Sequence, residues 1–297
     1  MSPSSLTRVT VPAVRARKVR NGNEPLVMVT AYDAPGARIA DEAGVDLILI
    51  GDSVAMVVLG YDDTLQVTIE DMAHHVAAVA RAKPRPLLIG DMPWMSYHVS
   101  LKDTVRNAAK LIKAGAHAVK LEGGRKRVPM IQAIIDAEIP VMGHLGLTPQ
   151  SINAMGGYRV QGRKPEAAFA LLDDARALEE AGCFAIVLEG VPDEVARMVT
   201  DTINVPTIGI GAGAHCDGQV LVFHDVLGIE DRITPKFVRR YASLKRDAVS
   251  AMAAFAADVR AGRFPSADES YHLSSEQAEA LGLYGGGGAG PVQARSA

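Results

Sequence analysis

The sequence predicts a (β/α)8 barrel followed by C-terminal helices. Eight short apolar runs alternate with Ala-rich stretches of helical period, which is the pattern of parallel βαβ units. The runs end near Asp33 and Asp225, 192 residues apart over seven steps or about 27 residues per unit, a spacing that suits a barrel of ~250 residues. A doubly wound open sheet has the same alternation and is the alternative fold.

Each run is a candidate strand because it is almost continuously apolar, as a strand covered on both faces must be. The eighth is the weakest, since few residues separate it from the seventh. In chain order the runs are LVMVTAYD from Leu26, DLILIGDS from Asp46, PLLIGDMP from Pro86, HAVKLEGG from His117, IPVMGHLG from Ile139, FAIVLEGV from Phe184, VPTIGIGAG from Val205 and QVLVFHDV from Gln219.

A repeated phrase supports a repeating unit. Each copy reads as a helix end, a glycine turn, a buried strand and an acid. The copies are AGVDLILIGD from Ala43, AGAHAVKLEG from Ala114 and AGCFAIVLEG from Ala181.

The two ends of the chain differ from its middle. PKFVRRYASLKRDAVSAMAAFAADVRAG from Pro235 predicts a long amphipathic helix, and SSEQAEALGLY from Ser274 a short capped one; these helices either close the barrel or pack on a neighbouring subunit. Residues 1–8 and the Gly-rich residues 285–297 are predicted to be disordered. We therefore expect an N-terminal segment (1–24), a catalytic barrel (25–262), and a short helix with a flexible tail (263–297).

Composition excludes several classes of protein. With 31 basic against 34 acidic residues, the chain lacks the positive charge that nucleic-acid binding needs. No apolar run reaches the ~18 residues of a membrane span, and the start of the chain has no apolar export segment. Cys183 and Cys216 have neither disulfide-framework nor C-x-x-C spacing. We expect a cytoplasmic protein that binds neither nucleic acid nor membrane.

Polar residues gather where the predicted strands end, which is where barrel enzymes carry their chemistry. So many acids at one rim would repel each other unless a cation neutralised them, and oxygen ligands favour Mg²⁺. Asp33, which precedes Ala-Pro, is better explained as a helix N-cap. The candidates are Asp33, Asp52, Ser53, Asp91, Lys120, Glu122, His144 and Glu189.

Two of these candidates keep a structural alternative. Lys120 lies two residues before Glu122, so both side chains point to the same face of a strand. Lys120 is either part of a structural ion pair or a cation that holds a substrate carboxylate or a developing oxyanion. His144, at the end of its strand, is either a core histidine or a site residue.

Five long motifs, in this order, resemble the ketopantoate hydroxymethyltransferase family. The resemblance extends from about Leu26 to about Val259. The motifs are GDSVAMVVLGYDDTLQVTIEDM from Gly51, GDMPWMSY from Gly90, AGAHAVKLEGG from Ala114, VMGHLGLTPQSINAMGGYRVQGR from Val141 and PTIGIGAGAHCDGQVLVFHDVLG from Pro206.

The resemblance implies a barrel of the phosphoenolpyruvate/pyruvate-like type, one Mg²⁺ per subunit, and a cytoplasmic homo-oligomer, typically a decamer. It implies transfer of a one-carbon unit from 5,10-methylenetetrahydrofolate to 3-methyl-2-oxobutanoate through a Mg-stabilised enolate. The product is 2-dehydropantoate, in the first committed step of pantothenate synthesis, which leads to coenzyme A.

The resemblance also implies roles for individual residues. Asp52 and Asp91 match the metal ligands, and Glu122 matches the acid that supports the metal. The keto acid is held by residues matching Asp52, Ser53, Asp91, Lys120 and His144. Glu189 matches the general base.

Two rival functions stay open at this point. One is another metal-dependent keto-acid C–C lyase or aldolase of the phosphoenolpyruvate/isocitrate-lyase type; such enzymes usually carry a reactive Cys in a mobile loop, whereas Cys183 lies at a predicted helix-to-strand turn. The other is a catalytically silent barrel, which has no use for so many neighbouring acids.

Overall fold

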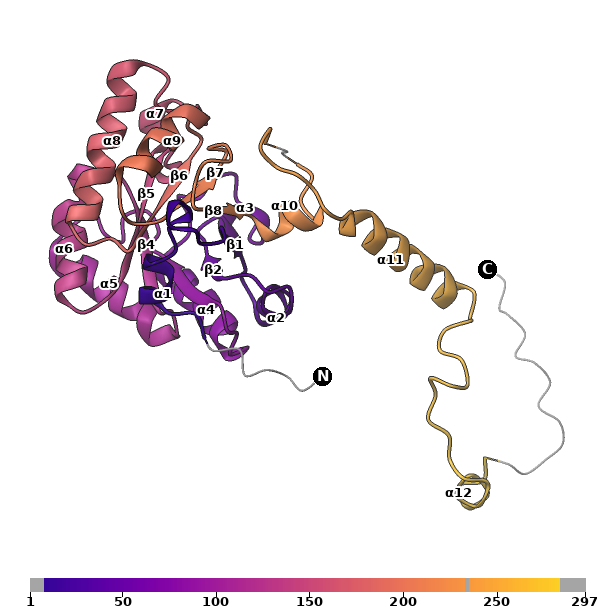
Figure 1. Cartoon of the computed structure of the whole chain (residues 1–297). Coiled ribbons are helices and arrows are strands. Elements are labelled where there is room, and N and C mark those ends of the chain that lie inside the picture. Colours follow the sequence, from indigo (N-terminus) through magenta and orange to yellow (C-terminus); the bar gives the residue numbers. More distant parts are fainter. Residues whose placement is uncertain (1–7, 233–234, 284–297) are drawn as a thin grey trace. The chain divides into compact units, whose positions relative to one another are not determined.

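The structure, a computed structural model, describes residues 8–232 and 235–283. Eight parallel strands form a closed barrel in which β1 pairs with both β2 and β8 (Figure 1). The predicted (β/α)8 barrel is therefore confirmed, and the open sheet is excluded. The strands are β1 Leu26–Thr30, β2 Leu47–Ile50, β3 Leu87–Asp91, β4 Ala118–Glu122, β5 Val141–Gly146, β6 Ala185–Glu189, β7 Thr207–Ile210 and β8 Gly218–Leu221.

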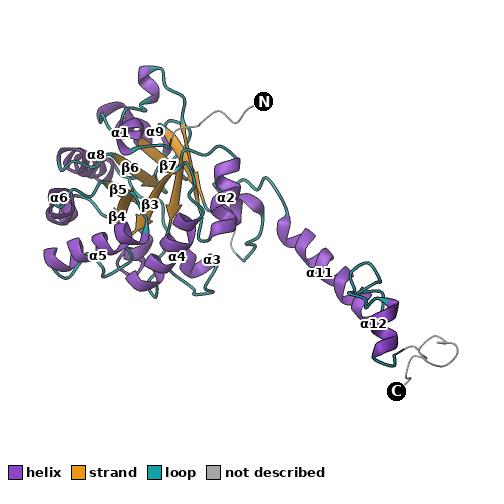
Figure 2. Ribbon diagram, turned by 90° about the horizontal axis from the view of Figure 1, so that it is seen from below, coloured by secondary structure: helices purple, strands orange, loops and turns teal. Residues whose placement is uncertain are grey.

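Helices between residues 11 and 227 lie around the strands of the barrel (Figure 2). No helix within the described part of the chain is both long and apolar enough to cross a membrane. The helices are α1 Val11–Arg15, α2 Ala34–Glu42, α3 Val54–Val57, α4 Ile69–Arg81, α5 Leu101–Ala114, α6 Val128–Asp136, α7 Ile152–Met155, α8 Pro165–Glu180, α9 Asp193–Thr202, α10 Phe223–Leu227, α11 Leu244–Arg260 and α12 Ser275–Ala280, with 3-10 turns η1 Val19–Asn21, η2 Arg125–Arg127 and η3 Pro149–Ser151.

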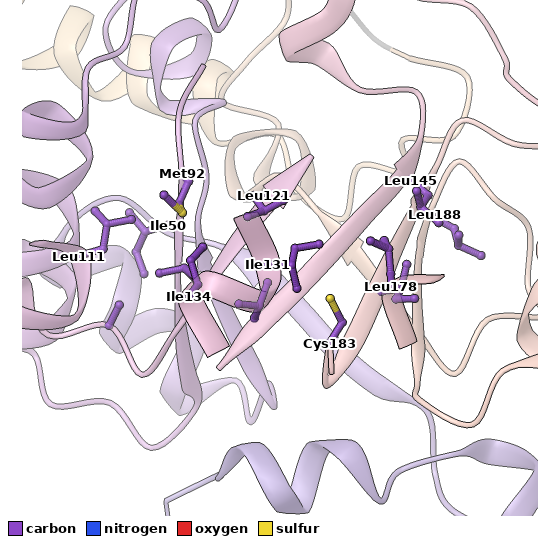
Figure 3. Close-up of a cluster of buried hydrophobic side chains, with 14 of the residues drawn as sticks. Ile50, Met92, Leu111, Leu121, Ile131, Ile134, Leu145, Leu178, Cys183 and Leu188 are labelled. Carbon is purple, nitrogen blue, oxygen red and sulfur yellow. The ribbon is translucent and has the colours of Figure 1, made fainter. Parts of the chain in front are cut away.

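Alternate residues of each strand face opposite sides of the barrel wall. Leu47 and Leu49 of β2 belong to the cluster that fills the barrel, whereas Ile48 and Ile50 belong to the cluster between strands and helices. Figure 3 shows part of this outer cluster, including Ile50. In β3, β4, β5 and β6 the inward alternation continues to polar residues at or near the strand ends and so directs them into the barrel mouth; these residues are Asp91, Lys120, Glu122, His144 and Glu189.

The N-terminal segment is anchored to the opposite end of the barrel. Val14 of α1 is completely buried within the inner cluster. Lys18 Nζ donates to Asp217 Oδ2 at 2.7 Å and to Thr200 O at 2.7 Å, and both charged side chains are buried. The Asp217 carboxylate also accepts from the backbone N–H of Val19 at 2.9 Å. This network ties the segment before β1 to the residues around β7 and β8.

Two predicted boundaries were wrong. The eighth run was expected to remain extended through His224 and Asp225, but β8 ends at Leu221 and α10 begins at Phe223. The helix expected from Pro235 begins only at Leu244. In the segment before it, Tyr241 N donates to Val226 O at 2.8 Å, a long-range bond that a continuous helix would not make.

The chain divides into two compact units, residues 1–243 and 244–297. This division precedes α11, whereas the predicted barrel domain extended to residue 262. In the second unit, Ser274 and Gln277 form the capping box of α12, which confirms the short capped helix. The segments predicted to be disordered, 1–8 and 285–297, lie outside the described residues, except for Arg8.

Candidate active site

Six of the predicted site residues converge at the carboxyl ends of β2 to β6. Three of them end strands: Asp91 ends β3, Glu122 ends β4 and Glu189 ends β6. The strand register places Asp91 opposite Lys120, and Glu122 opposite His144. The remaining member, Asp52, follows β2 by two residues.

The first part of the site is a pair of buried aspartates next to an ammonium group. Asp52 N donates to Asp91 Oδ2 at 3.2 Å. Lys120 Nζ lies 2.8 Å from Asp91 Oδ1. This is an ion pair between two almost completely buried side chains, and Lys120 counters part of the cost of burying the Asp91 carboxylate. A carboxylate oxygen accepts along more than one direction, so Asp91 can pair with Lys120 and still offer an oxygen to a second cation.

The second part is a histidine between two glutamates. His144 Nδ1 lies 3.4 Å from Glu122 Oε1 and 3.3 Å from Lys120 Nζ, while Nε2 lies 3.2 Å from Glu189 Oε2. The Glu189 side chain is 16% exposed and the His144 side chain 3%. Glu189 thus lies on the more solvent-accessible side of the cluster.

The two cationic groups retain their charge despite burial. Burial and the nearby Lys120 lower the pKa of His144, but hydrogen bonds and charge from Glu122 and Glu189 outweigh them and raise it to about 9. Burial also lowers the pKa of Lys120, but Asp91, Glu122 and Asp52 raise it by more. At neutral pH the site therefore contains an ammonium and an imidazolium group.

The carboxylates respond differently to the same surroundings. Burial, followed by repulsion from Asp91 and Glu122, raises the pKa of Asp52 well above its usual range. Burial likewise raises the pKa of Asp91. Burial opposes ionisation of Glu122, but His144 and Lys120 hold its pKa below the usual value. The positive charge near Glu122 is thus enough to favour its ionised form, whereas the positive charge near the two aspartates is not.

Ser53 and Asp33 lie at the same end of the barrel. Ser53 precedes α3 without capping it, and its hydroxyl shares a 2.9 Å hydrogen bond with Tyr32 Oη. Asp33 Oδ1 accepts from Gly36 N at 2.7 Å as the N-cap of α2, which confirms its interpretation as a cap.

Sequence reasoning missed two residues that contact the acids. The side chain of Gln150 donates to Asp52 Oδ2 at 2.9 Å, and the hydroxyl of Tyr97 accepts from Glu122 N at 3.2 Å. Both residues lie in motifs that were already distinctive, GDMPWMSY and VMGHLGLTPQ. Their neutral side chains carry no charge pattern, so only the fold shows their proximity to the acids.

The donor set fits a magnesium ion. Within residues 8–232 and 235–283, no three His, Cys, Asp or Glu side chains are arranged as a complete metal centre. Mg²⁺ does not need one, because it commonly takes one or two carboxylates and completes its shell with water and substrate oxygens. Asp52 and Asp91 supply such a pair, held next to each other by the 3.2 Å hydrogen bond from Asp52 N to Asp91 Oδ2.

Neither cysteine is placed as a nucleophile. Cys183 and Cys216 are free and buried, and burial raises the pKa of the Cys183 thiol to about 12. Cys183 lies between α8 and β6, at the end of the barrel opposite the acids. It is not in a position to act as the loop cysteine of the rival lyase function.

The fold resembles solved barrel enzymes of low sequence identity. A phosphonopyruvate hydrolase structure matches 94% of this chain and 96% of its own, with a TM-score of 0.58 at 16% identity. A 2,3-dimethylmalate lyase, described as a PEP mutase/isocitrate lyase superfamily member, matches 92% and 94%, with a TM-score of 0.55 at 19% identity. These likenesses support the predicted phosphoenolpyruvate/pyruvate-like type of barrel.

Sequence comparison identifies the family. The ketopantoate hydroxymethyltransferase family model matches residues 8–267. The 3-methyl-2-oxobutanoate hydroxymethyltransferase 2 of Bradyrhizobium diazoefficiens is 54% identical over 280 residues, 94% of this chain and 95% of that protein. The 3-methyl-2-oxobutanoate hydroxymethyltransferase of Ignicoccus hospitalis is 57% identical over 249 residues, 84% and 94% of the two chains. The chain therefore belongs to the ketopantoate hydroxymethyltransferase family of transferase enzymes.

Proposed function

We propose that this enzyme transfers a hydroxymethyl unit from 5,10-methylenetetrahydrofolate to 3-methyl-2-oxobutanoate, giving 2-dehydropantoate for the synthesis of pantothenate. Membership of the family supports the reaction. The observation that carries the assignment of residues is the buried cluster in which Asp52 and Asp91 adjoin Lys120 and His144. Such a cluster suits a small, doubly oxygenated anion. The choice of folate as donor rests on the family alone.

Asp52 and Asp91 are the proposed ligands of one Mg²⁺ per subunit, and Glu122 supports them from beside Lys120. Their raised pKa values support this assignment, because they indicate a shortage of positive charge even with Lys120 beside Asp91. When bound, Mg²⁺ supplies Lewis-acid chemistry to the carbonyl group of the keto acid.

Lys120, Ser53 and His144 are proposed to hold the keto acid, with Asp52 and Asp91 beside it. The Lys120 ammonium would pair with negative charge on the substrate oxygens, where a buried cation acts most strongly. The Ser53 hydroxyl does not cap α3, and with Tyr32 Oη as the donor of their 2.9 Å hydrogen bond it can donate to the substrate. His144, charged at neutral pH, adds a second donor.

Glu189 is the proposed general base. It removes the proton from C3 of the keto acid, and the resulting carbanion forms the new C–C bond to the one-carbon unit. The two C–N bonds that held this carbon on the folate break, one water supplies the hydroxyl oxygen, and tetrahydrofolate leaves with the protons from C3 and from the water on its two nitrogens. The position of Glu189 supports this role: it ends β6, faces the barrel mouth, and keeps 16% of its side chain exposed. Its contact with the charged His144 Nε2 at 3.2 Å orients the Glu189 carboxylate toward the barrel mouth.

The enzyme is proposed to act as a cytoplasmic homo-oligomer, a decamer by analogy with the family. Free, buried cysteines suit a reducing compartment. Large apolar side chains of α11, among them Val249, Met252 and Phe255, are 60%, 68% and 51% exposed, which supports self-association. Analytical ultracentrifugation tests the assembly, and a monomer at working concentration contradicts it.

Deuterium exchange tests the proposed function. The protein is incubated with MgCl2 and 3-methyl-2-oxobutanoate in deuterated water, first without and then with 5,10-methylenetetrahydrofolate. We expect Mg²⁺-dependent exchange at C3 in the first reaction and 2-dehydropantoate in the second. Absence of both exchange and product would favour the catalytically silent barrel. Exchange without product would show that the folate assignment is wrong.

A further inference from the structure

Gln150 connects two of the three buried carboxylates. It lies in η3, after β5, and is 4% exposed. Its side-chain Nε2 donates to Asp52 Oδ2 at 2.9 Å, and its backbone N donates to Glu122 Oε2 at 3.1 Å. The same Nε2 also donates to Met92 O at 3.0 Å. One residue therefore spans the ends of β2, β3 and β4.

Tyr97 determines which way the Gln150 amide faces. Its hydroxyl donates to Gln150 Oε1 at 2.6 Å and accepts from Glu122 N at 3.2 Å. Turning the amide over would place its oxygen against the Asp52 carboxylate and the Met92 carbonyl, two repulsive contacts. Tyr97 is itself 1% exposed, so its ring is held by packing and its hydroxyl has these partners within reach.

The Gln150 side-chain amide suits a position next to the Asp52 carboxylate because the amide is neutral. Asp52 needs a donor to fix its orientation, since its carboxylate also faces repulsion from Asp91 and Glu122. A further ammonium or guanidinium group here would compete with a divalent cation for the same oxygens. An amide donates a hydrogen bond to Asp52 without supplying the charge that the cation should supply.

We propose that Gln150, oriented by Tyr97, is a positioning residue that holds Asp52 beside Asp91 ready for a divalent cation. The inference rests on the proposed magnesium site and deepens it. Groups that orient metal ligands typically affect metal affinity by about 10–100-fold, so a loss of this size is expected when the amide is removed. Tyr97 acts through Gln150, so its effect should not add to that of Gln150.

Calorimetric titration of MgCl2 into the full chain, without substrate, tests the inference independently of turnover. Gln150→Met keeps the length of the side chain and removes the amide, while Tyr97→Phe removes a single oxygen. We expect Mg²⁺ affinity to fall about 10–100-fold in Gln150→Met and by a smaller factor in Tyr97→Phe. The double variant should match Gln150→Met, because residues acting through one contact are not additive.

Gln161→Met is the matched control. The Gln161 side chain donates to Arg159 O and not to the acids, so the same substitution there should leave Mg²⁺ affinity unchanged. Thermal unfolding of each metal-free variant separates positioning from folding. Should Gln150→Met not fold, Tyr97→Phe decides the question.

The outcomes separate this inference from the proposed function. A wild-type chain that binds Mg²⁺, with unchanged affinity in Gln150→Met and Tyr97→Phe, overturns the inference and leaves the magnesium site standing. Lower thermal stability with unchanged affinity also overturns it, because that result makes the pair purely structural. A wild-type chain that does not bind Mg²⁺ overturns the proposed site and the inference with it.

Discussion

Asp91 and Lys120 face each other across β3 and β4, with Asp91 Oδ1 2.8 Å from Lys120 Nζ. Both side chains are almost completely buried, and Lys120 also lies 3.9 Å from Glu122 Oε1. The ammonium therefore offsets part of the repulsion among the acids. This contact is compatible with both interpretations of Lys120, the structural ion pair and the substrate-binding cation.

Lys120→Met separates these interpretations. Removing one partner of a buried ion pair typically costs about 3–5 kcal/mol, and saturating Mg²⁺ should restore much of this because it supplies the lost positive charge. We expect keto-acid affinity to fall at least about 10-fold, or 1.4 kcal/mol, even with Mg²⁺ present. Urea unfolding and keto-acid titration measure the two effects. Normal affinity together with a large, Mg²⁺-independent loss of stability would make Lys120 structural.

Asp52→Asn and Asp91→Asn test the metal ligands. Each change removes one negative charge with little change in shape, so Mg²⁺ affinity should fall by at least about 10-fold while the fold persists. The titration is made with keto acid present. Asp33→Asn is the control, since Asn is also a good N-cap and Asp33 already caps α2. Unchanged Mg²⁺ affinity in both site variants would contradict the assignment.

Glu189→Gln tests the general base. Gln has the same size but cannot accept the C3 proton, so exchange and product formation should fall together by roughly 10²–10⁴-fold, with Mg²⁺ and keto-acid affinity nearly normal. Glu194→Gln, on the exposed first turn of α9, should leave both rates unchanged. If exchange persisted while product formation collapsed, Glu189 would act on the folate half-reaction, and another group would remove the proton.

Lys18→Met tests the anchor of the N-terminal segment. The change leaves the buried Asp217 carboxylate without its ammonium partner, so the free energy of unfolding should fall by about 3–5 kcal/mol. Arg20→Met is the control; Arg20 bonds to Asp201 O and Asn204 Oδ1 at an exposed position, and its loss should cost about 0.5 kcal/mol or less. Equal effects of the two substitutions in urea unfolding would show that the network contributes no more than a surface contact.

His98→Gln tests a pH effect on stability. Burial, followed by repulsion from Arg127, lowers the pKa of His98 to about 4, against 6.5 for the free side chain. The unfolded chain thus binds a proton more readily, and stability falls as the pH drops from 6.5 toward 4. His98→Gln should lose less stability between about pH 7 and about pH 5 than the wild type. His74→Gln, at an exposed position, should behave like the wild type.

Much of the fold and part of the site could be predicted from local pattern. Apolar runs of the right length indicated all eight strands, because a strand buried on both faces needs a continuous apolar stretch. The two-residue spacing of Lys120 and Glu122 correctly predicted that they share the inner face of β4. The weakest run was also wrong at its end, because the chain leaves the sheet after Leu221: Phe223 N donates to Thr30 Oγ1 at 2.9 Å and α10 begins there.

The contacts within the site were decided by the tertiary structure. The pairing of Glu122 with His144 follows from the register of β4 and β5, which depends on closure of the barrel. Tyr97 and Gln150 are 53 residues apart and meet only because two loops reach the same acids. A charged residue at the end of an apolar run can be recognised from the sequence as a candidate site residue, because a buried charge needs a partner. A neutral amide or hydroxyl carries no such signal, and its role depends on which groups the folded chain brings to it.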